Sequence, residues 1–287
     1  MAAKVYFSRE ITPEKVKELY AMLGAELGGR VAVKLHSGER GNQNFLRPEF
    51  WQPIINEVGG TVIETNTAYK GERHTTEQHR ELLKYHGWAR YFKTEILDGD
   101  VDDLVLPIPD GAAIRENYVG GNIVNYDSML VLSHFKGHPS GGFGGAVKQL
   151  SIGMASAFGK KNIHGSGKIE GFWHGDHDSF LESMADAAAS VVRYFEGRIA
   201  YINVMKNMSV DCDCCAVAED PCIADIGILA SLDPIAIDQA CVDLVYASSD
   251  PGKPHLVERI ESRNGIHTLE AAAKLGFGSR EYELVEV

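Results

Sequence analysis

Hydrophobic and polar residues follow two different periods along the first hundred residues. The short apolar runs VYF at 5–7 and VAVKLH at 31–36 are typical of buried strands, and a further run at 61–64 predicts a third strand. The segments at 47–58 and 75–86 show helical spacing, and Thr12 followed by Pro13 marks the start of another helix. Strands that alternate with helices predict an α/β fold, with parallel or mixed sheets covered by helices.

Two polar loops follow the second and third predicted strands. They read HSGERGNQNF after the run at 31–36 and NTAYKGERH after the run at 61–64. Ligands bind beyond the carboxyl ends of parallel strands, so the charged residues of both loops are expected on one rim. These residues are His36, Glu39, Arg40, Lys70, Arg73 and His74. Arg40 and Arg73 either hold the phosphate or carboxylate of a cofactor through paired hydrogen bonds or lie free in solvent.

The second half of the chain contains a glycine-dense turn between a predicted strand and a predicted helix. The apolar run MLVLS at 129–133 leads into it, and the segment at 146–158 follows with helical spacing. Glycines let a ligand approach the backbone closely, and the first N–H groups of a helix attract anions. This favours a small-molecule pocket, with a glycine-rich connection and surface histidines as the alternative. The residues concerned are Gly141, Gly142, Gly144 and Gly145, with His134, Lys136, His138, Lys148 and His164 around them.

Four of the five cysteines lie within a short segment of the last third of the chain. They are Cys212, Cys214, Cys215 and Cys222. Thiolates at this density suit zinc or an iron–sulfur cluster, although reactive or inert thiols are the alternatives. Adjacent cysteines rarely both ligate one ion, so the expected set combines Cys212, one of Cys214 and Cys215, and Cys222, with a fourth ligand from elsewhere in the chain. The fifth, Cys241, is predicted in the core, Asp233 as a helix cap, and Asp238 as a residue that orients a basic group in the cleft.

Composition narrows the classes of partner. The chain has 287 residues, of which 44% are hydrophobic, and can bury a large core without a disulfide or a metal. A formal net charge of −12 argues against a general nucleic-acid binder, which needs a basic face. No apolar run approaches about 18 residues and the N-terminus does not read as a secretion signal, so we expect a cytoplasmic protein with no membrane partner.

The stretch at 133–164 resembles the core of lactate racemase and its relatives. It reads as His-x9-Lys with GFGG between, and a further histidine follows sixteen residues after the lysine. In that family a lysine carries a covalently attached nickel-pincer nucleotide, one histidine ligates the nickel and another moves the substrate proton. The resemblance implies that His138 transfers the proton, Lys148 attaches the cofactor and His164 ligates the metal. The loop GERH at 71–74 resembles the one that supplies a second proton-transfer histidine, which implies His74, with His79 and His86 as competitors.

Nearly the whole chain is similar to the iron–sulfur associated family of domain of unknown function 362. The similarity rests on VKLHSGERGNQNFLRP, TNTAYKGER, SHFKGHPSGGFGGAVKQLSIGMAS, the CDC of DCDCC, and DIGILASLDPIAIDQA. Many members carry a ferredoxin-like segment with two sets of spaced cysteines after the position of His164. This chain has no cysteine there, so an electron relay through that segment is missing.

We therefore expect two lobes, 1–110 with the rim loops and 111–287 with the glycine-rich motif and the cysteines, separated by a cleft. The first hypothesis is a metal- or cofactor-dependent enzyme acting on a small oxygenated acid by proton or hydride transfer, as a racemase does. The second is a non-catalytic iron–sulfur or metal-binding protein that passes electrons or metal to a partner. A third is a family member that only binds a ligand. Lys148 separates the first two, because only a cofactor-dependent enzyme needs it.

Overall fold

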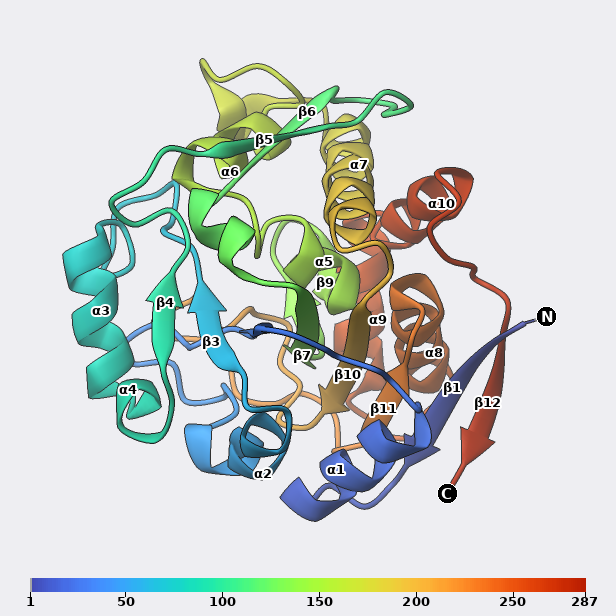
Figure 1. Cartoon of the computed structure of the whole chain (residues 1–287). Helices are drawn as coiled ribbons and strands as arrows, with labels where there is room; N and C mark the ends of the chain where they lie inside the picture. The colour runs from blue at the N-terminus through green and yellow to red at the C-terminus, as the bar shows by residue number, and fades with distance from the viewer. Residues whose placement is uncertain (1) are drawn as a thin grey trace.

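The computed structural model describes residues 2–287 and is organised around one large sheet (Figure 1). In this part of the chain the sheet has eight strands in the order β12-β1-β11-β10-β7-β2-β3-β4. Only β11 runs antiparallel to its neighbours, and the other pairs are parallel. The predicted α/β class is confirmed. The strands are β1 (Ala3–Ser8), β2 (Val31–Lys34), β3 (Thr61–Glu64), β4 (Thr94–Ile96), β7 (Ser128–His134), β10 (Ile199–Met205), β11 (Gly227–Ser231) and β12 (Tyr282–Glu286).

Strands from both predicted lobes share this sheet. β2 pairs with β7, and β1 pairs with β11, so the predicted boundary at residue 110 does not separate two sheets. Two small hairpins lie outside it, β5 (Leu104–Pro107) with β6 (Glu116–Val119), and β8 (Lys136–His138) with β9 (Gly142–Gly144). The second hairpin is the glycine-dense turn, because its strands lie on either side of residues 139–141.

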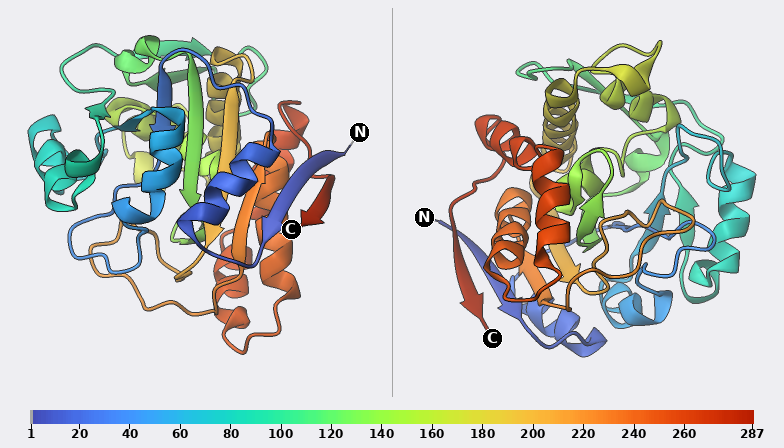
Figure 2. Two further views of the ribbon diagram at one scale, coloured as in Figure 1. Left: turned by 60° about the horizontal axis from the view of Figure 1, so that its bottom comes forward. Right: turned by 180° about the vertical axis from the view of Figure 1, so that it is seen from behind.

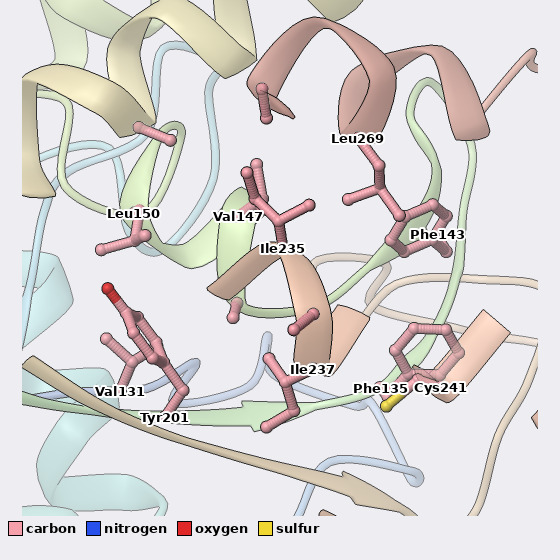
Figure 3. Packing of buried hydrophobic residues seen from close by; sticks show 14 of the residues in the cluster. Val131, Phe135, Phe143, Val147, Leu150, Tyr201, Ile235, Ile237, Cys241 and Leu269 are labelled. Carbon is pink, nitrogen blue, oxygen red and sulfur yellow. The ribbon is translucent and has the colours of Figure 1, made fainter. Parts of the chain in front are cut away.

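Helices cover both faces of the sheet. α1 (Pro13–Met22) and α2 (Pro48–Val58) lie together on one face, as the left view of Figure 2 shows, and α5, α7 and α8 pack on the other. Side chains of β7 alternate accordingly, with Leu130 in one core cluster and Val131 in the other. Figure 3 shows the cluster that contains Val131, which lies there beside Tyr201 of β10 and below Leu150 of α5. The other helices are α3 (Thr76–Tyr85), α4 (Trp88–Tyr91), α5 (Ala146–Leu150), α6 (Ala157–His164), α7 (His177–Tyr194), α8 (Pro234–Ala247), α9 (Lys253–Ser262) and α10 (Ile266–Lys274), with short 3-10 turns at Gly121–Asn125 and Phe172–His174.

The predicted N-terminal caps are confirmed, whereas the prediction of one helix over 146–158 is wrong. Thr12 caps α1 and Asp233 caps α8, each by accepting backbone N–H groups. The segment at 146–158 instead contains the end of one helix and the start of another. The first helix ends at Leu150, and the second begins at Ala157 after its N-cap, Ser156. Glycine disfavours a helix interior, and Gly153 has no room for a side chain, since a Cβ there would lie 2.2 Å from the Gln149 carbonyl oxygen. The break lets α6 turn back across the carboxyl ends of the strands.

Among residues 2–287, none of the helices is both long and apolar enough to cross a membrane.

Candidate active site

A cavity of about 170 Å³ lies at the carboxyl ends of the parallel strands. The last residues of β2, β3 and β7, which are Lys34, Glu64 and His134, all contribute to its lining. α5 and α6 contribute Lys148, Lys160 and His164. The site therefore occupies the position at which parallel sheets bind ligands. His138, Lys148 and His164 all line this one cavity, although the sequence separates them by up to 26 residues (164 − 138).

Charged residues at the strand ends form what we call the cavity floor: Lys34, Glu64, His134 and Lys136. The Lys34 ammonium group contacts the Glu64 carboxylate, which also accepts hydrogen bonds from the Ser37 backbone N–H at 2.8 Å and its hydroxyl at 2.9 Å. Burial alone would raise the pKa of Glu64, but the charge of Lys34 holds it well below its usual range. The pair is therefore ionised inside the protein, and the Lys34 ammonium group also donates to the Leu35 carbonyl oxygen.

The other half of the floor is held by Asp213 of the cysteine loop (206–226). Its carboxylate lies 2.9 Å from the Lys136 Nζ and 2.9 Å from the His134 Nδ1. The second ring nitrogen of His134 lies 2.6 Å from the Lys206 carbonyl oxygen. Burial would raise the pKa of Asp213, but His134 and Lys136 hold it well below its usual range. This arrangement anchors the cysteine loop to the end of β7.

Lys148, Lys160 and His164 form what we call the helical wall. The described residues provide no side-chain hydrogen bond or ion pair for the Lys148 amine or for either ring nitrogen of His164. The His164 ring stacks on Phe180 with centroids 4.6 Å apart, and the Trp173 ring contacts it at a tilt of 54° with the same centroid distance of 4.6 Å. Burial, with the charge of Lys148 adding to it, lowers the pKa of His164 to about 3, so the ring is neutral at pH 7 and keeps a free lone pair.

The glycine-dense turn fixes the tautomer of His138. Its Nδ1 accepts the backbone N–H groups of Ser140 at 3.2 Å and Gly141 at 2.9 Å, and Gly142 follows with a φ of +79° that favours glycine. Burial, assisted by the charge of Lys148, lowers the pKa of His138 to about 4. Since Nδ1 accepts, the neutral ring carries its proton on Nε2. His138 is thus oriented as an N–H donor.

Two of the four clustered cysteines reach this histidine. The ligand atoms of His138, Cys212 and Cys214 all lie within 4.8 Å of one another. A hydrogen bond with Cys214 and the charges of Lys148 and Lys136 lower the pKa of Cys212 well below its usual range despite its burial. Cys222 lies elsewhere, with its sulfur 3.5 Å from the Met208 carbonyl oxygen, and Cys215 is outside the group. Among the described residues, the group that could hold one ion is therefore His138, Cys212 and Cys214, and a ligand set that includes Cys222 stays a prediction.

This donor set fits a single soft ion better than a cluster. Iron–sulfur clusters usually use four thiolates, whereas the residues described here bring together two thiols and one imidazole. Zinc accepts such a mixed set and leaves one position open. Lys148 and His164 have the free nitrogens that a nickel-pincer nucleotide would need. However, the cavity of about 170 Å³ is smaller than the roughly 300–1,000 Å³ of ordinary ligand pockets, which favours a small acid over a nucleotide. No step of the reaction is therefore assigned to it.

Part of the predicted rim lies outside the cavity. Arg40 is exposed, pairs with Glu72 and lies over the Tyr85 ring, while exposed His74 only approaches the Thr67 carbonyl oxygen at 3.3 Å. Neither residue lines the cavity, and Lys70 and Glu39 do not either. His36 and Arg73 do line it, with 3.2 Å between the His36 Nε2 and an Arg73 nitrogen.

The start of α5 does not offer the predicted anion site. The N–H groups of Ala146 and Val147 donate to the Asp238 carboxylate at 2.7 and 2.9 Å. Asp238 therefore caps this helix. The prediction that it orients a basic group in the cleft is wrong. Gly144 and Gly145 remain in the lining, whereas Gly141 and Gly142 shape the turn beneath His138. A side chain at Gly145 would meet Asp238 at 2.3 Å, which explains the glycine there.

Several residues of the site were missed in the sequence. The loop after β2 presents three consecutive amides, and their side chains bind carbonyl oxygens of the cysteine loop: Asn42 to Cys215 at 2.9 Å, Gln43 to Ala218 at 2.7 Å and Asn44 to Glu219 at 2.8 Å. Three amides in one predicted loop were the available signal. Lys160 was also missed, although it precedes His164 by four residues and so shares its helix face.

A family model described as Domain of unknown function (DUF362) matches residues 31–243. No curated protein matches the chain. Among solved structures, the chain is similar to the lactate racemase apoprotein from Thermoanaerobacterium thermosaccharolyticum, with 14% identity and a TM-score of 0.44 over 69% of this chain and 50% of that one. It is also similar to a protein from Thermotoga maritima, with 11% identity and a TM-score of 0.40 over 92% of this chain and 59% of that one. The chain thus spans between half and three-fifths of the length of these proteins.

Proposed function

Because the chain belongs to the DUF362 family, whose description names no activity, its function has to be argued from the cavity, and we propose that this cavity is the active site of an enzyme that transfers a proton on a small oxygenated acid. The observation that carries the proposal is the meeting of two neutral histidines and several buried cations in one small cavity.

The charge of the lining favours an anionic substrate. The whole chain has a formal net charge of −12, yet the lining contains a single carboxylate, Glu64, which Lys34 already pairs. A cationic cavity with low-dielectric walls concentrates anions and strengthens their binding. About 170 Å³ suits an acid of a few carbon atoms. Three of the five basic side chains of the lining are paired with carboxylates, and Lys148 and Lys160 are the two that are not; the five are Lys34, Arg73, Lys136, Lys148 and Lys160.

The histidines have complementary states for moving a proton. His138 presents an N–H group, because its Nδ1 is occupied by backbone donors. His164 has a neutral ring whose nitrogens have no partner among the described residues, so it can accept a proton. A cation at the carboxylate makes the neighbouring C–H group more acidic, and Lys148 has no protein partner that would compete with such a role. We therefore assign proton acceptance to His164, carboxylate binding to Lys148, and to His138 a hydrogen bond from its N–H group to the negative charge that develops when the proton leaves.

Incorporation of solvent deuterium into a panel of 2-hydroxy and 2-oxo acids of two to four carbons tests this function. The wild-type protein should exchange at least one acid faster than buffer alone does. His138→Gln and His164→Gln should each slow this exchange by about 10²- to 10⁴-fold, as expected for a general acid or base. His255→Gln, at an exposed position on α9, is the matched control and should exchange like the wild type. No exchange above buffer by the wild type, or equal exchange by all variants, contradicts the proposal.

The covalent cofactor that the racemase resemblance implies at Lys148 has its own readout. The intact mass of protein purified without oxygen should match the bare sequence if the cavity works as proposed here. An adduct on Lys148 would restore the cofactor-dependent form of the function.

Metal binding is a second candidate, and the cluster of His138, Cys212 and Cys214 is the observation that favours it. Elemental analysis of the same preparation should then give one zinc or iron per chain. Cys214→Ser should remove the metal, and Cys222→Ser should keep it, because Cys222 lies outside the group. A metal-free wild type contradicts this candidate.

A further inference from the structure

Lys160 differs from the paired lysines of the cavity in having no carboxylate partner. Lys34 pairs with Glu64, and Lys136 pairs with Asp213. The Lys160 amine instead donates to two uncharged oxygens, the Thr65 hydroxyl at 2.6 Å and the Ala155 carbonyl at 2.6 Å. Lys160 is only 8% exposed, so its amine has little water to replace a partner.

The acid near Lys160 is already committed to other donors. Asp98 accepts the backbone N–H groups of Asn66 and Ala157, each at 2.9 Å. The Thr65 hydroxyl donates to the Gly153 carbonyl oxygen at 3.1 Å, so towards Lys160 it serves as an acceptor. Two N–H groups of the amine are thus fixed. The third tetrahedral position of the amine nitrogen has no acceptor in the described part of the chain. The Lys160 side chain also lines the cavity.

An amine held in this way keeps a usable lone pair near neutral pH. Burial lowers the pKa of Lys160 to about 7, with Asp98 opposing the shift and Lys34 adding to it. In the neutral amine the two N–H groups remain with Thr65 and Ala155, so the lone pair takes the free position. Desolvated lysines of this kind attack carbonyl carbons.

We propose that Lys160 is the nucleophile that forms an imine with a small 2-oxo acid bound in this cavity. The inference rests on the proposed function and narrows its substrate class to carbonyl-bearing acids. The nitrogen lone pair forms the bond to the carbonyl carbon, and the C=O bond breaks. The oxygen leaves as water with both protons of the amine, so the step needs no oxidant or reductant.

Imine formation also links Lys160 to the histidines. The imine nitrogen takes up a proton from solvent, and the protonated imine draws electrons from C3 of the 2-oxo acid and makes the C–H group there acidic. A 2-oxo acid has no hydrogen on C2, so with this substrate class the proton that His164 accepts is the one on C3. Lys160 and His164 are four residues apart on α6, so both side chains project from the same helix face. The carboxylate of the 2-oxo acid would be bound by Lys148, which also lines the cavity.

Reductive trapping tests the imine. The full-length protein is incubated with pyruvate and sodium cyanoborohydride, and the product is examined by intact mass and peptide mapping. We expect one reduced adduct on Lys160 in the wild type and in Lys161→Met, a neighbouring lysine outside the lining. The adduct should be lost in Lys160→Met and in Lys160→Arg, which keeps a positive charge and cannot form an imine. If the methionine variant is unfolded by circular dichroism, the arginine variant decides.

Absence of an adduct from the wild type, an adduct on Lys148 instead, or an unchanged adduct in a folded Lys160 variant overturns the inference. Solvent exchange into pyruvate without reductant separates this result from the proposed function. Exchange without an adduct contradicts the imine alone, whereas an adduct without exchange supports the imine and contradicts the proton transfer.

Discussion

At the cavity floor each buried charge faces a partner of opposite sign, whereas on the helical wall none does. Lys34 pairs with Glu64, and Lys136 with Asp213, so the cost of burying these charges is offset within the fold. Lys148 and Lys160 are not offset in this way. The difference teaches that charge alone does not mark a functional lysine. We assign the floor to stability and the wall to ligand chemistry.

The largest effect on stability is expected at the floor. Glu64→Ala leaves the Lys34 ammonium group buried without its partner, so the free energy of unfolding should fall by about 3–5 kcal/mol. Chemical denaturation measures it. Glu81→Ala, which breaks an exposed pair with Lys84, is the control and should cost at most about 0.5 kcal/mol. If Glu64→Ala lowered the free energy of unfolding by less than about 1 kcal/mol, the buried pair of the cavity floor would contribute no more to stability than an exposed pair.

The same pair predicts how stability depends on pH. Because the native pKa of Glu64 lies below its unfolded value of about 4.3, the stabilisation is complete above that pH and is lost as the pH falls through and below it. The wild type should lose up to about 1.4 kcal/mol per pH unit from this group. Glu64→Gln should lack this component between about pH 4.3 and pH 3. Parallel curves for the two proteins would show that Glu64 is not ionised in the native state.

A smaller loss is expected where the rim loop holds the cysteine loop. Asn42→Ala removes the hydrogen bond to the Cys215 carbonyl oxygen, which should lower the free energy of unfolding by about 1 kcal/mol. It should also speed the reaction of Cys214 with a thiol reagent. Asn56→Ala, at an exposed position on α2, is the control. Unchanged thiol reactivity would mean that the amides do not position the cysteines.

The smallest change in stability is expected on the wall. Lys148→Met removes no protein hydrogen bond or ion pair within the described chain, so the free energy of unfolding should change by less than about 0.5 kcal/mol. Solvent exchange into the substrate acid should nevertheless be lost. A loss of stability comparable to that of Glu64→Ala would mean that Lys148 stabilises the fold, as the charged residues of the cavity floor do.

The sequence predicted the fold well because the apolar periods of the strands are strong and local. The strand at 61–64 and the Thr12 cap agree with β3 and α1. The single helix at 146–158 failed because Ala155 and Ser156 at the break pair with the backbone of Val119 and Tyr118 on β6, which is far away in the sequence. The resemblance to a known family placed His138, Lys148 and His164 in one site. The sequence could not show that Asp238 caps the start of α5, because this contact joins residues far apart in the sequence. Nor could it distinguish Lys160 from Lys34, since partners such as Glu64 lie far away in sequence.

Equilibrium binding of a small carboxylate tests the central claim, that the wall presents its cations to an anionic ligand. Isothermal titration calorimetry with pyruvate and lactate measures it in the wild type, in Lys148→Met and in Lys161→Met. The wild type and Lys161→Met should bind one equivalent of at least one acid, more weakly as salt is added, and Lys148→Met should bind none. No binding by the wild type, or equal binding by Lys148→Met, would contradict the account.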